Sequence, residues 1–237
     1  MTPAPEVPPL QLLALHGWAG DQRCWQLWGA QAQRRGWSLV AAERGYGQLP
    51  PSQPGWDPRV QRRIVLGHSL GPHLLAPSLW ESATGAVLLA SFAAFVPEGR
   101  AGRPVRTALR GMAAQLHGGQ AEAMLEQFMQ RVAAPFPREQ LPDGPLEQGI
   151  GPEGLQRLQA DLELLDATAG LPQGWPEQLP VLIVEAEDDA IVAAASRERL
   201  KQLLPHASVW TLPRAGHGLL GSNLSTAVLE FLADGLP

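Results

Sequence analysis

Hydrophobic residues along this chain gather in short runs that alternate with amphipathic segments. Six runs have the length and composition of buried strands, and they lie near residues 10–16, 37–42, 62–67, 85–91, 181–187 and 208–213. Apolar residues at helical spacing fill four further segments, near residues 22–35, 71–81, 194–204 and 222–234. Strands that alternate with helices predict an α/β fold, with a mostly parallel sheet of about six strands and flanking helices.

One long segment, from about 97 to 170, interrupts this alternation. It contains no convincing strand, and its apolar spacing predicts three helices, at residues 103–116, 119–132 and 152–166. We therefore expect a single domain, residues 1–237, with a helical insertion at about 97–170 that lies over the strand ends.

The third apolar run leads directly into Gly67-His68-Ser69-Leu70-Gly71. This is the pattern G-x-S-x-G between a strand and a helix, where a tight turn presents the serine hydroxyl at a helix N-terminus. Glycine at both ends of the pattern permits the close packing that such a turn requires. The pattern predicts a nucleophilic serine, and the alternative interpretation is a glycine-rich turn with a capping serine.

Two later loops offer an acid and a base that can activate this serine. A buried strand from Val181 runs into the acidic segment 187–189, and the last strand runs into a loop in which glycines flank His217. The carboxyl ends of parallel strands share one edge of a sheet, so both loops should lie beside Ser69. We expect His217 to take the proton of Ser69, and a carboxylate to orient His217.

Several acidic side chains compete for the role of this carboxylate. We favour Asp189, because residues 186–192 fit the pattern G-x-x-D-x-x-V of such loops, with alanine in place of the glycine. Asp188 remains an alternative, and Glu187 and Glu185 are weaker candidates.

The reaction also needs backbone N–H donors for the oxyanion that forms during attack. We expect the N–H of Leu70, which directly follows the nucleophile, and that of Trp18, in the loop after the first strand. His16 in that loop is expected to be structural. The side chains expected to contact substrate are Trp18, His68, Phe92, Phe95 and Phe128.

These motifs resemble the α/β-hydrolases, in particular the carboxylesterases that demethylate pimeloyl-[acyl-carrier protein] methyl ester in biotin synthesis. Residues 16–25, HGWAGDQRCW, are similar to the opening motif of those esterases, and so are Leu89-Ala-Ser91 and residues 155–166. The resemblance covers most of the chain. The triad motifs are shared across the superfamily, whereas the His-Gly-Trp loop and the helical insertion point to this subgroup, in which the insertion is a cap that shapes a substrate tunnel.

The chain departs from this family in two places. Only a few residues precede the first strand, so the two edge strands that usually open the fold are expected to be absent. A proline- and glycine-rich stretch between Glu43 and Arg62 stands where a full helix is usual. We therefore expect a trimmed version of the fold.

Composition narrows the functional class further. The net charge is −5, and no apolar run approaches the ~20 residues that span a bilayer. We therefore expect a soluble, cytoplasmic monomer that contacts neither a membrane nor nucleic acid.

The single cysteine, Cys24, excludes an internal disulfide and suits a reducing compartment. No cluster has metal-ligand spacing and no glycine loop has the phosphate-binding pattern, so we expect neither a metal nor a cofactor.

The predicted insertion carries a group of arginines with no acid among them. Arg100, Arg103, Arg106 and Arg110 occur within eleven residues, and the last three share a helix face. Arginine pairs well with carboxylates and phosphate. One interpretation is a docking face for an acidic acyl-carrier protein and its phosphopantetheine, and the other is a solvated helix face.

Taken together, these residues predict a serine carboxylesterase that hydrolyses an acyl methyl ester, with the pimeloyl-carrier methyl ester as the specific expectation. One alternative is another reaction on the same triad, by a small-ester or lipid esterase, an acyltransferase or a lyase. A second alternative is a ligand-binding protein without catalytic activity, since fold alone does not determine function.

Overall fold

The computed structural model describes residues 9–219 and 223–236. Within them lies a six-stranded sheet, in the order β2-β1-β3-β4-β5-β6, in which all neighbouring strands are parallel. The strands are β1 (Leu10–Leu15), β2 (Ser38–Ala41), β3 (Arg62–His68), β4 (Gly85–Leu89), β5 (Val181–Ala186) and β6 (Ser208–Leu212). Each lies where the hydrophobic pattern predicts it, and the α/β fold is confirmed.

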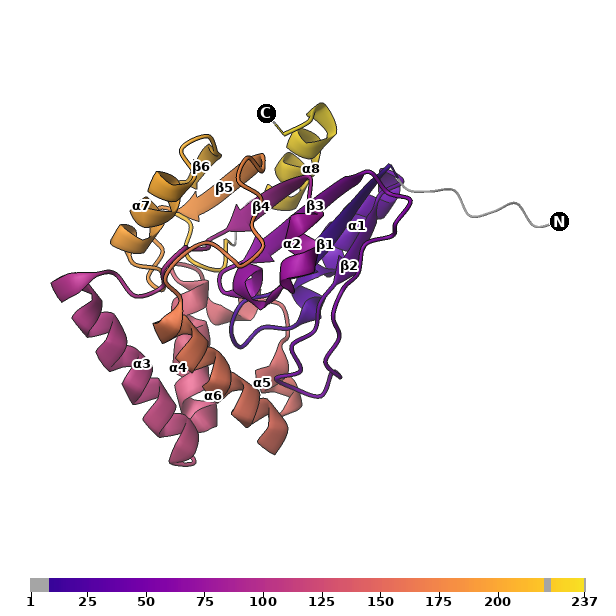
Figure 1. Ribbon diagram of the computed structural model, residues 1–237. Coiled ribbons are helices and arrows are strands. Elements are labelled where there is room, and N and C mark those ends of the chain that lie inside the picture. Colours follow the sequence, from indigo (N-terminus) through magenta and orange to yellow (C-terminus); the bar gives the residue numbers. More distant parts are fainter. Residues whose placement is uncertain (1–8, 220–222, 237) are drawn as a thin grey trace.

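Helices cover both faces of this sheet, which explains why its central strands read as continuous apolar runs. On one face, α1 (Gln26–Arg34) and α8 (Leu224–Asp234) pack against alternate residues of β1, β3, β4 and β5 (Figure 1). On the other face, Trp80 of α2 (Pro77–Glu81) and Leu200 of α7 (Ala194–Leu203) pack against the remaining residues of β3, β4 and β5.

The prediction of one continuous helix over residues 71–81 is wrong at residues 75–76, where the chain is not helical. The chain instead forms a short 3-10 segment, η2 (Gly71–Leu74), and then becomes extended before α2 begins. Proline disfavours helical geometry in the residue before it, and Ala76 accordingly has a ψ of 139° ahead of Pro77. The segment predicted as one helix at 22–35 likewise starts with a 3-10 turn, η1 (Gln22–Trp25).

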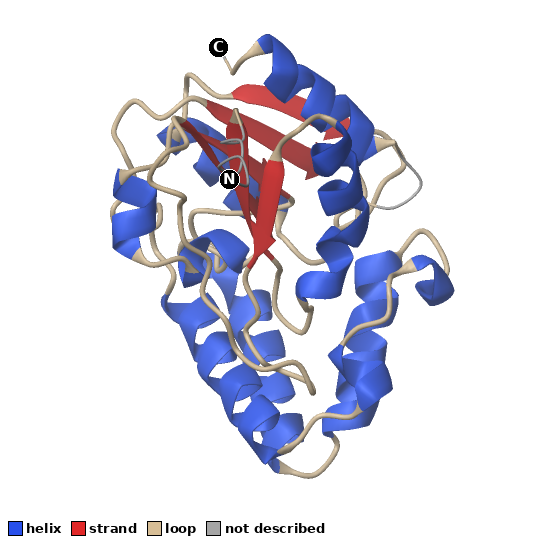
Figure 2. Ribbon diagram, turned by 90° about the vertical axis from the view of Figure 1, so that its right-hand side faces the viewer, coloured by secondary structure: helices blue, strands red, loops and turns tan. Residues whose placement is uncertain are grey.

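The predicted insertion is a group of helices between β4 and β5, gathered beyond the strand ends (Figures 1 and 2). Its α-helices are α3 (Gly102–His117), α4 (Ala121–Ala133), α5 (Pro145–Gln148) and α6 (Pro152–Ala167), with 3-10 turns η3 (Gly99–Ala101) and η4 (Arg138–Gln140). The turns and α5 are too short to give a periodic signal and were not predicted. A second apolar cluster joins these helices to residues at the carboxyl edge of the sheet, including Trp18 and Leu70.

The stretch between β2 and β3 contains no helix among the described residues, as its proline and glycine content predicts. It instead makes one isolated antiparallel bridge, between Glu43 and Ser52. The expected absence of the two opening edge strands concerns residues 1–8, which lie outside the described residues.

Candidate active site

Ser69 stands in the turn between β3 and η2, at the carboxyl edge of the sheet. Its φ of 54° lies in the left-handed region, which is strained for a residue other than glycine. Two hydrogen bonds hold this conformation: the Ser69 N–H donates to the Leu89 carbonyl at 2.9 Å, and the Ser91 hydroxyl donates to the Ser69 carbonyl at 2.7 Å. The turn is therefore fixed by the neighbouring strand β4.

The two glycines of the motif are required by close packing. A Cβ at Gly67 would collide with the ring of Pro72, and a Cβ at Gly71 would collide with the Leu15 carbonyl. Gly67 therefore lets β3 pack against Pro72 of η2, and Gly71 lets the turn pack against the end of β1, as the motif predicts.

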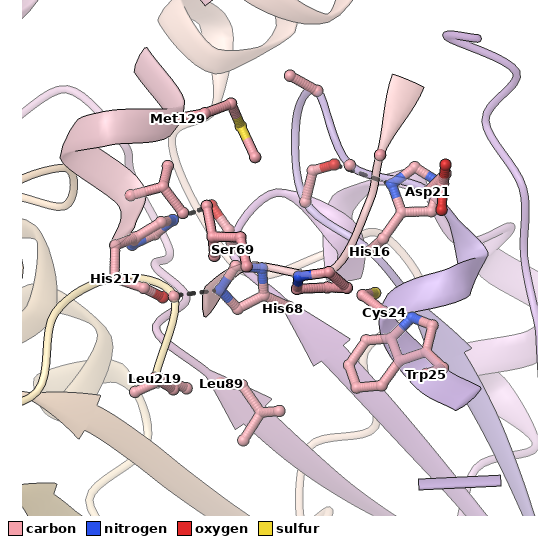
Figure 3. Close-up of a pocket in the computed structure, with 18 of the residues that line it drawn as sticks. His16, Asp21, Cys24, Trp25, His68, Ser69, Leu89, Met129, His217 and Leu219 are labelled. Carbon is pink, nitrogen blue, oxygen red and sulfur yellow. Dashed lines mark hydrogen bonds between the residues drawn. The ribbon is translucent and has the colours of Figure 1, made fainter. Parts of the chain in front are cut away.

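His217 links the serine to an acid. Its Nε2 lies 3.0 Å from the Ser69 Oγ (Figure 3), and its Nδ1 lies 2.9 Å from the Asp189 Oδ2. A carboxylate oxygen accepts hydrogen bonds, so Nδ1 carries the proton and Nε2 is left to accept from the serine hydroxyl. The three side chains come from the loops that follow β3, β5 and β6, as predicted.

Asp189 is held as an ionised acceptor. Its side chain is completely buried, and its Oδ1 accepts from the N–H groups of Ile191 and Val192 at 2.8 and 2.9 Å. Burial opposes ionisation, but the nearby His217 and the two amides outweigh it and lower the pKa of Asp189. Its buried place beside the imidazole matches the expected position of the acid.

The competing acids lie elsewhere. Asp188 is exposed, and Glu187 accepts a hydrogen bond from the N–H of Arg214. Glu185 pairs with Lys201 and Thr211 across β5, α7 and β6.

A second imidazole supports the backbone of the histidine loop. His68 Nε2 donates to the carbonyl of His217 at 2.9 Å, and the two rings lie 5.0 Å apart. Burial, followed by the proximity of His217, lowers the pKa of His68 to about 4. His68 is therefore neutral at physiological pH.

The loop after β1 is anchored from several directions. His16 is buried, its Nδ1–H donates to the Gly17 carbonyl at 2.9 Å, and its Nε2 accepts from the Arg44 N–H at 3.1 Å. Both ring nitrogens are thus engaged by backbone, as expected of a structural histidine. Trp18 donates its indole N–H to the Leu158 carbonyl at 2.9 Å, and its ring meets Phe128 edge-on at 4.9 Å.

A cavity of about 290 Å³ opens above Ser69 and His217. Its walls are the loop after β1, the N-terminal end of α1, the second half of α4, the segment 141–144, the histidine loop and the start of α8. Three of the residues predicted to contact substrate line this cavity: Trp18, Phe128 and His68, the last of which is seen in Figure 3.

Phe92 and Phe95 do not line this cavity, so the structure does not place them with the other residues that we expected to contact substrate. Both are buried: Phe92 stacks on His73 at 5.3 Å and meets Phe95 edge-on at 5.1 Å. They follow β4, and their rings pack in the apolar cluster that joins the insertion helices to the carboxyl edge of the sheet.

Sequence reasoning missed the contribution of α1 and its preceding turn. Trp25 and Trp28 line the cavity, and so does Leu27, which is 61% exposed at the start of the helix. The sequence did contain a signal for this contribution. The segment has more large apolar residues than one buried helix face needs, which indicates that some of them face a cavity. Val132, at the end of α4, is a further cavity residue that was not predicted.

The charge in this cavity is acidic. Among its described lining residues, Asp21 and Asp143 are acids and neither lysine nor arginine is present. Asp21 pairs with Arg23, which lies outside the lining, whereas Asp143 is exposed.

No group of three histidine, cysteine or acidic side chains in the described residues is arranged to hold a metal ion. None of the described helices has the length and apolar content of a membrane span.

The arginine face lies on α3, and no residue of α3 lines the cavity. Arg103 and Arg110 are exposed, whereas Arg106 lies 3.5 Å from Asp166 on α6. The acid that the local sequence lacks is thus supplied by the neighbouring helix.

Residues 12–231 match the model of the alpha/beta hydrolase family. The chain belongs to this family. No curated protein matches the sequence of this α/β-hydrolase at a significant level.

Solved structures agree on the fold. This α/β-hydrolase is similar to an esterase (EaEST) from Exiguobacterium antarcticum, with a TM-score of 0.74 and 16% identity over 94% of this chain and 92% of that one. It is also similar to MenH from S. aureus, with a TM-score of 0.65 and 15% identity over 98% of this chain and 96% of that one. A third similar structure is the esterase RhEst1 from Rhodococcus sp. ECU1013, with a TM-score of 0.59 and 20% identity over 96% of this chain and 91% of that one. At such identities the likeness extends to the fold alone.

Proposed function

We propose that this α/β-hydrolase is a serine esterase, with Ser69 as nucleophile, His217 as base and Asp189 as the residue that orients the base. The continuous line of hydrogen bonds from the Ser69 hydroxyl through His217 to a buried carboxylate carries this proposal. Such an arrangement serves to withdraw a proton from a serine that attacks a carbonyl carbon.

The reaction follows from the positions of these atoms. As Ser69 Oγ bonds to the ester carbonyl carbon, its proton passes to His217 Nε2, and the carbonyl electrons move to the oxygen. Collapse of this intermediate breaks the bond to the alcohol, which leaves with the proton from His217. A water molecule, deprotonated by His217, then releases the acid from Ser69.

The oxyanion is expected to bind the backbone N–H groups of Trp18 and Leu70. Within the described part of the chain, neither group donates a hydrogen bond to the protein, which supports this assignment. Leu70 is the N-cap residue directly before η2, and the N–H groups at the start of a helical segment lack partners within it. Each such donor typically lowers the barrier by about 3 kcal/mol.

The cavity favours an uncharged, apolar substrate. Trp18, Trp25, Trp28, Phe128 and Val132 give it largely apolar walls. Burial of an unpaired carboxylate in such surroundings is unfavourable, and this lining supplies no cation to pair with one. We therefore assign neutral acyl esters as the substrate class.

We further propose a carrier-bound methyl ester, pimeloyl-[acyl-carrier protein] methyl ester, as the physiological substrate. The His-Gly-Trp loop and the exposed arginines of α3 support this assignment. The double variant Arg103→Glu/Arg110→Glu is the sharpest test, because Arg106 is already paired. It should lower kcat/KM for the carrier-bound ester about tenfold or more and leave that for a small soluble ester unchanged.

The control is Arg34→Glu/Arg199→Glu, which makes the same change in charge at exposed arginines outside the insertion. If both double variants lower kcat/KM for the carrier-bound ester to the same extent, α3 is not the docking face.

The esterase proposal is tested by a fluorophosphonate probe and by p-nitrophenyl esters of graded chain length, each with Ser69→Ala as control. We expect Ser69-dependent labelling and hydrolysis. Labelling without hydrolysis of any ester would indicate an acyltransferase or a lyase on the same triad. Failure to label Ser69 would indicate a ligand-binding protein.

A further inference from the structure

The insertion and the core of the protein meet at a buried carboxylate. Asp161 on α6 is only 1% exposed, and both of its oxygens accept from the guanidinium of Arg44, at 2.7 Å each. The hydroxyl of Tyr46, itself fully buried, donates to the same carboxylate at 2.5 Å. Paired, charge-assisted bonds of this kind fix both distance and orientation.

The segment that holds Asp161 also holds the loop after β1. The N–H of Arg44 donates to His16 Nε2 at 3.1 Å, and the opposite ring nitrogen donates to the Gly17 carbonyl. The chain of contacts thus runs from Asp161 through Arg44 and His16 to the peptide that precedes Trp18.

A second connection reaches Trp18 directly. Leu158, whose carbonyl accepts from the Trp18 indole, lies three residues before Asp161 and therefore on the same face of α6. The helix is also pressed against this segment at Gly154, where a Cβ would collide with the Tyr46 carbonyl. The position of α6 therefore bears on Trp18 from two sides.

The loop needs such support because its backbone is strained. Ala19, which follows Trp18, has a φ of 61°, in the left-handed region that alanine rarely adopts. Strained conformations persist where the surrounding structure over-determines them. Without α6 in place, we expect the loop to relax and the Trp18 N–H to move.

We propose that Asp161 is a positioning residue that, through Arg44 and Tyr46, seats α6 against the loop after β1 and fixes the Trp18 amide for the oxyanion. The inference rests on the esterase function proposed above. It makes closure of the insertion over the core a condition for assembly of the oxyanion site, although Asp161 does not touch substrate.

The test compares Asp161→Asn with Asp166→Asn. Both change an arginine-paired acid of α6 to its amide, but the Arg106–Asp166 pair is exposed and lies within the insertion. Asp161→Asn should lower kcat for a p-nitrophenyl ester about 10- to 100-fold and change KM less than threefold. Affinity for a trifluoromethyl ketone, which forms an oxyanion on Ser69, should fall in proportion to kcat/KM, whereas affinity for a matched unreactive ether should not.

Hydrogen exchange of the amides of residues 16–20 gives a readout that does not depend on activity. Exchange should become about tenfold faster in Asp161→Asn and stay unchanged in Asp166→Asn. If no ester is hydrolysed but this exchange difference is seen, the esterase function fails while the coupling of α6 to the loop stands. Unchanged exchange and kcat in Asp161→Asn would overturn the inference.

Tyr46→Phe provides a second variant if Asp161→Asn does not fold. It removes one hydroxyl donor and keeps the ion pair between Arg44 and Asp161. We expect the same pattern at a smaller size, with kcat about three- to tenfold lower. Wild-type kcat and wild-type exchange in Tyr46→Phe would also contradict the inference.

Discussion

Three histidines near Ser69 differ in role because their hydrogen-bond partners fix different protons. His217 donates from Nδ1 to a carboxylate and keeps Nε2 for the serine. His68 donates from Nε2 to a carbonyl, and His16 uses both nitrogens on backbone. Only one of the three therefore offers a ring nitrogen to the Ser69 hydroxyl, and its partner Asp189 selects that tautomer.

Asp189→Asn should therefore cost far more activity than Asp188→Asn. An amide can donate to Nδ1 and stabilise the wrong tautomer, so we expect kcat to fall about 10³- to 10⁴-fold. Asp188 is exposed, and its amide variant should keep kcat within about twofold. Steady-state kinetics on a p-nitrophenyl ester measures both, and comparable losses in the two variants would reassign the acid.

The lowered pKa of His68 predicts a loss of stability in acid. Its pKa is about 4 in the folded protein and about 6.5 when unfolded, so between these values the unfolded chain binds a proton that the folded chain does not. The free energy of unfolding should thus fall as pH decreases from 7 to 4. Over this range the free energy of unfolding of His68→Asn should fall by about 3 kcal/mol less than that of the wild type, as measured by urea unfolding. Parallel losses in the two proteins would show that His68 titrates normally.

At the scale of elements, the sequence predicted a helix or strand well where a hydrophobic pattern extends over several residues. It predicted poorly where a single residue determines where an element ends. The strands could be predicted because burial on both faces forces apolar residues at nearly every position. The interruption of the predicted helix at Ala76 depends on one proline. Helix α5 has only four residues, about one helical turn, which is too short for a periodic hydrophobic pattern.

The same reasoning applies to the candidate site. Ser69, Asp189 and His217 were predictable because each follows a strand, so topology alone brings them together. Trp25 and Trp28 were not, because whether a helix turns its apolar side toward a cavity depends on the packing angle of that helix. The contacts of α6 with Trp18 and with Arg44 join residues more than a hundred positions apart and leave no local trace in the sequence.

Two glycines in the insertion helices should respond oppositely to alanine. Gly111 lies within α3 with open space around it, so Gly111→Ala should raise the free energy of unfolding by about 0.5–1 kcal/mol through helix propensity. Gly154→Ala should lower it by at least about 2 kcal/mol, because the new methyl group meets the Tyr46 carbonyl. Urea unfolding compares them, and a stabilised Gly154→Ala would contradict the close contact of α6 with the core.

At the scale of the whole molecule, charge and cavity act in the same direction. The chain carries a net charge of −5, and the acids Asp21 and Asp143 line the cavity. The field at the cavity therefore opposes the entry of anionic esters, and its effect on their association should weaken as salt screens it.

A matched pair of esters tests this at constant chain length. Dimethyl adipate should be hydrolysed with a kcat/KM about tenfold or more above that of monomethyl adipate, which carries a carboxylate, and 0.5 M salt should narrow the gap. Asp143→Asn should narrow it too, whereas Asp234→Asn, an exposed acid outside the cavity, should not. A preference for the anionic ester would overturn the assigned substrate class.

The histidine loop also rests on the insertion, and this governs how heat should affect the protein. The Gly218 N–H donates to the Val132 carbonyl at the end of α4 at 2.8 Å, and Gly216 packs directly against Ala134. Helices outside a central sheet open at lower free energy than its core strands. Activity should therefore disappear on warming before the sheet melts. Mutations that raise the melting temperature by strengthening the sheet should leave the temperature range of catalysis unchanged, and those that secure α4 and α6 should extend it.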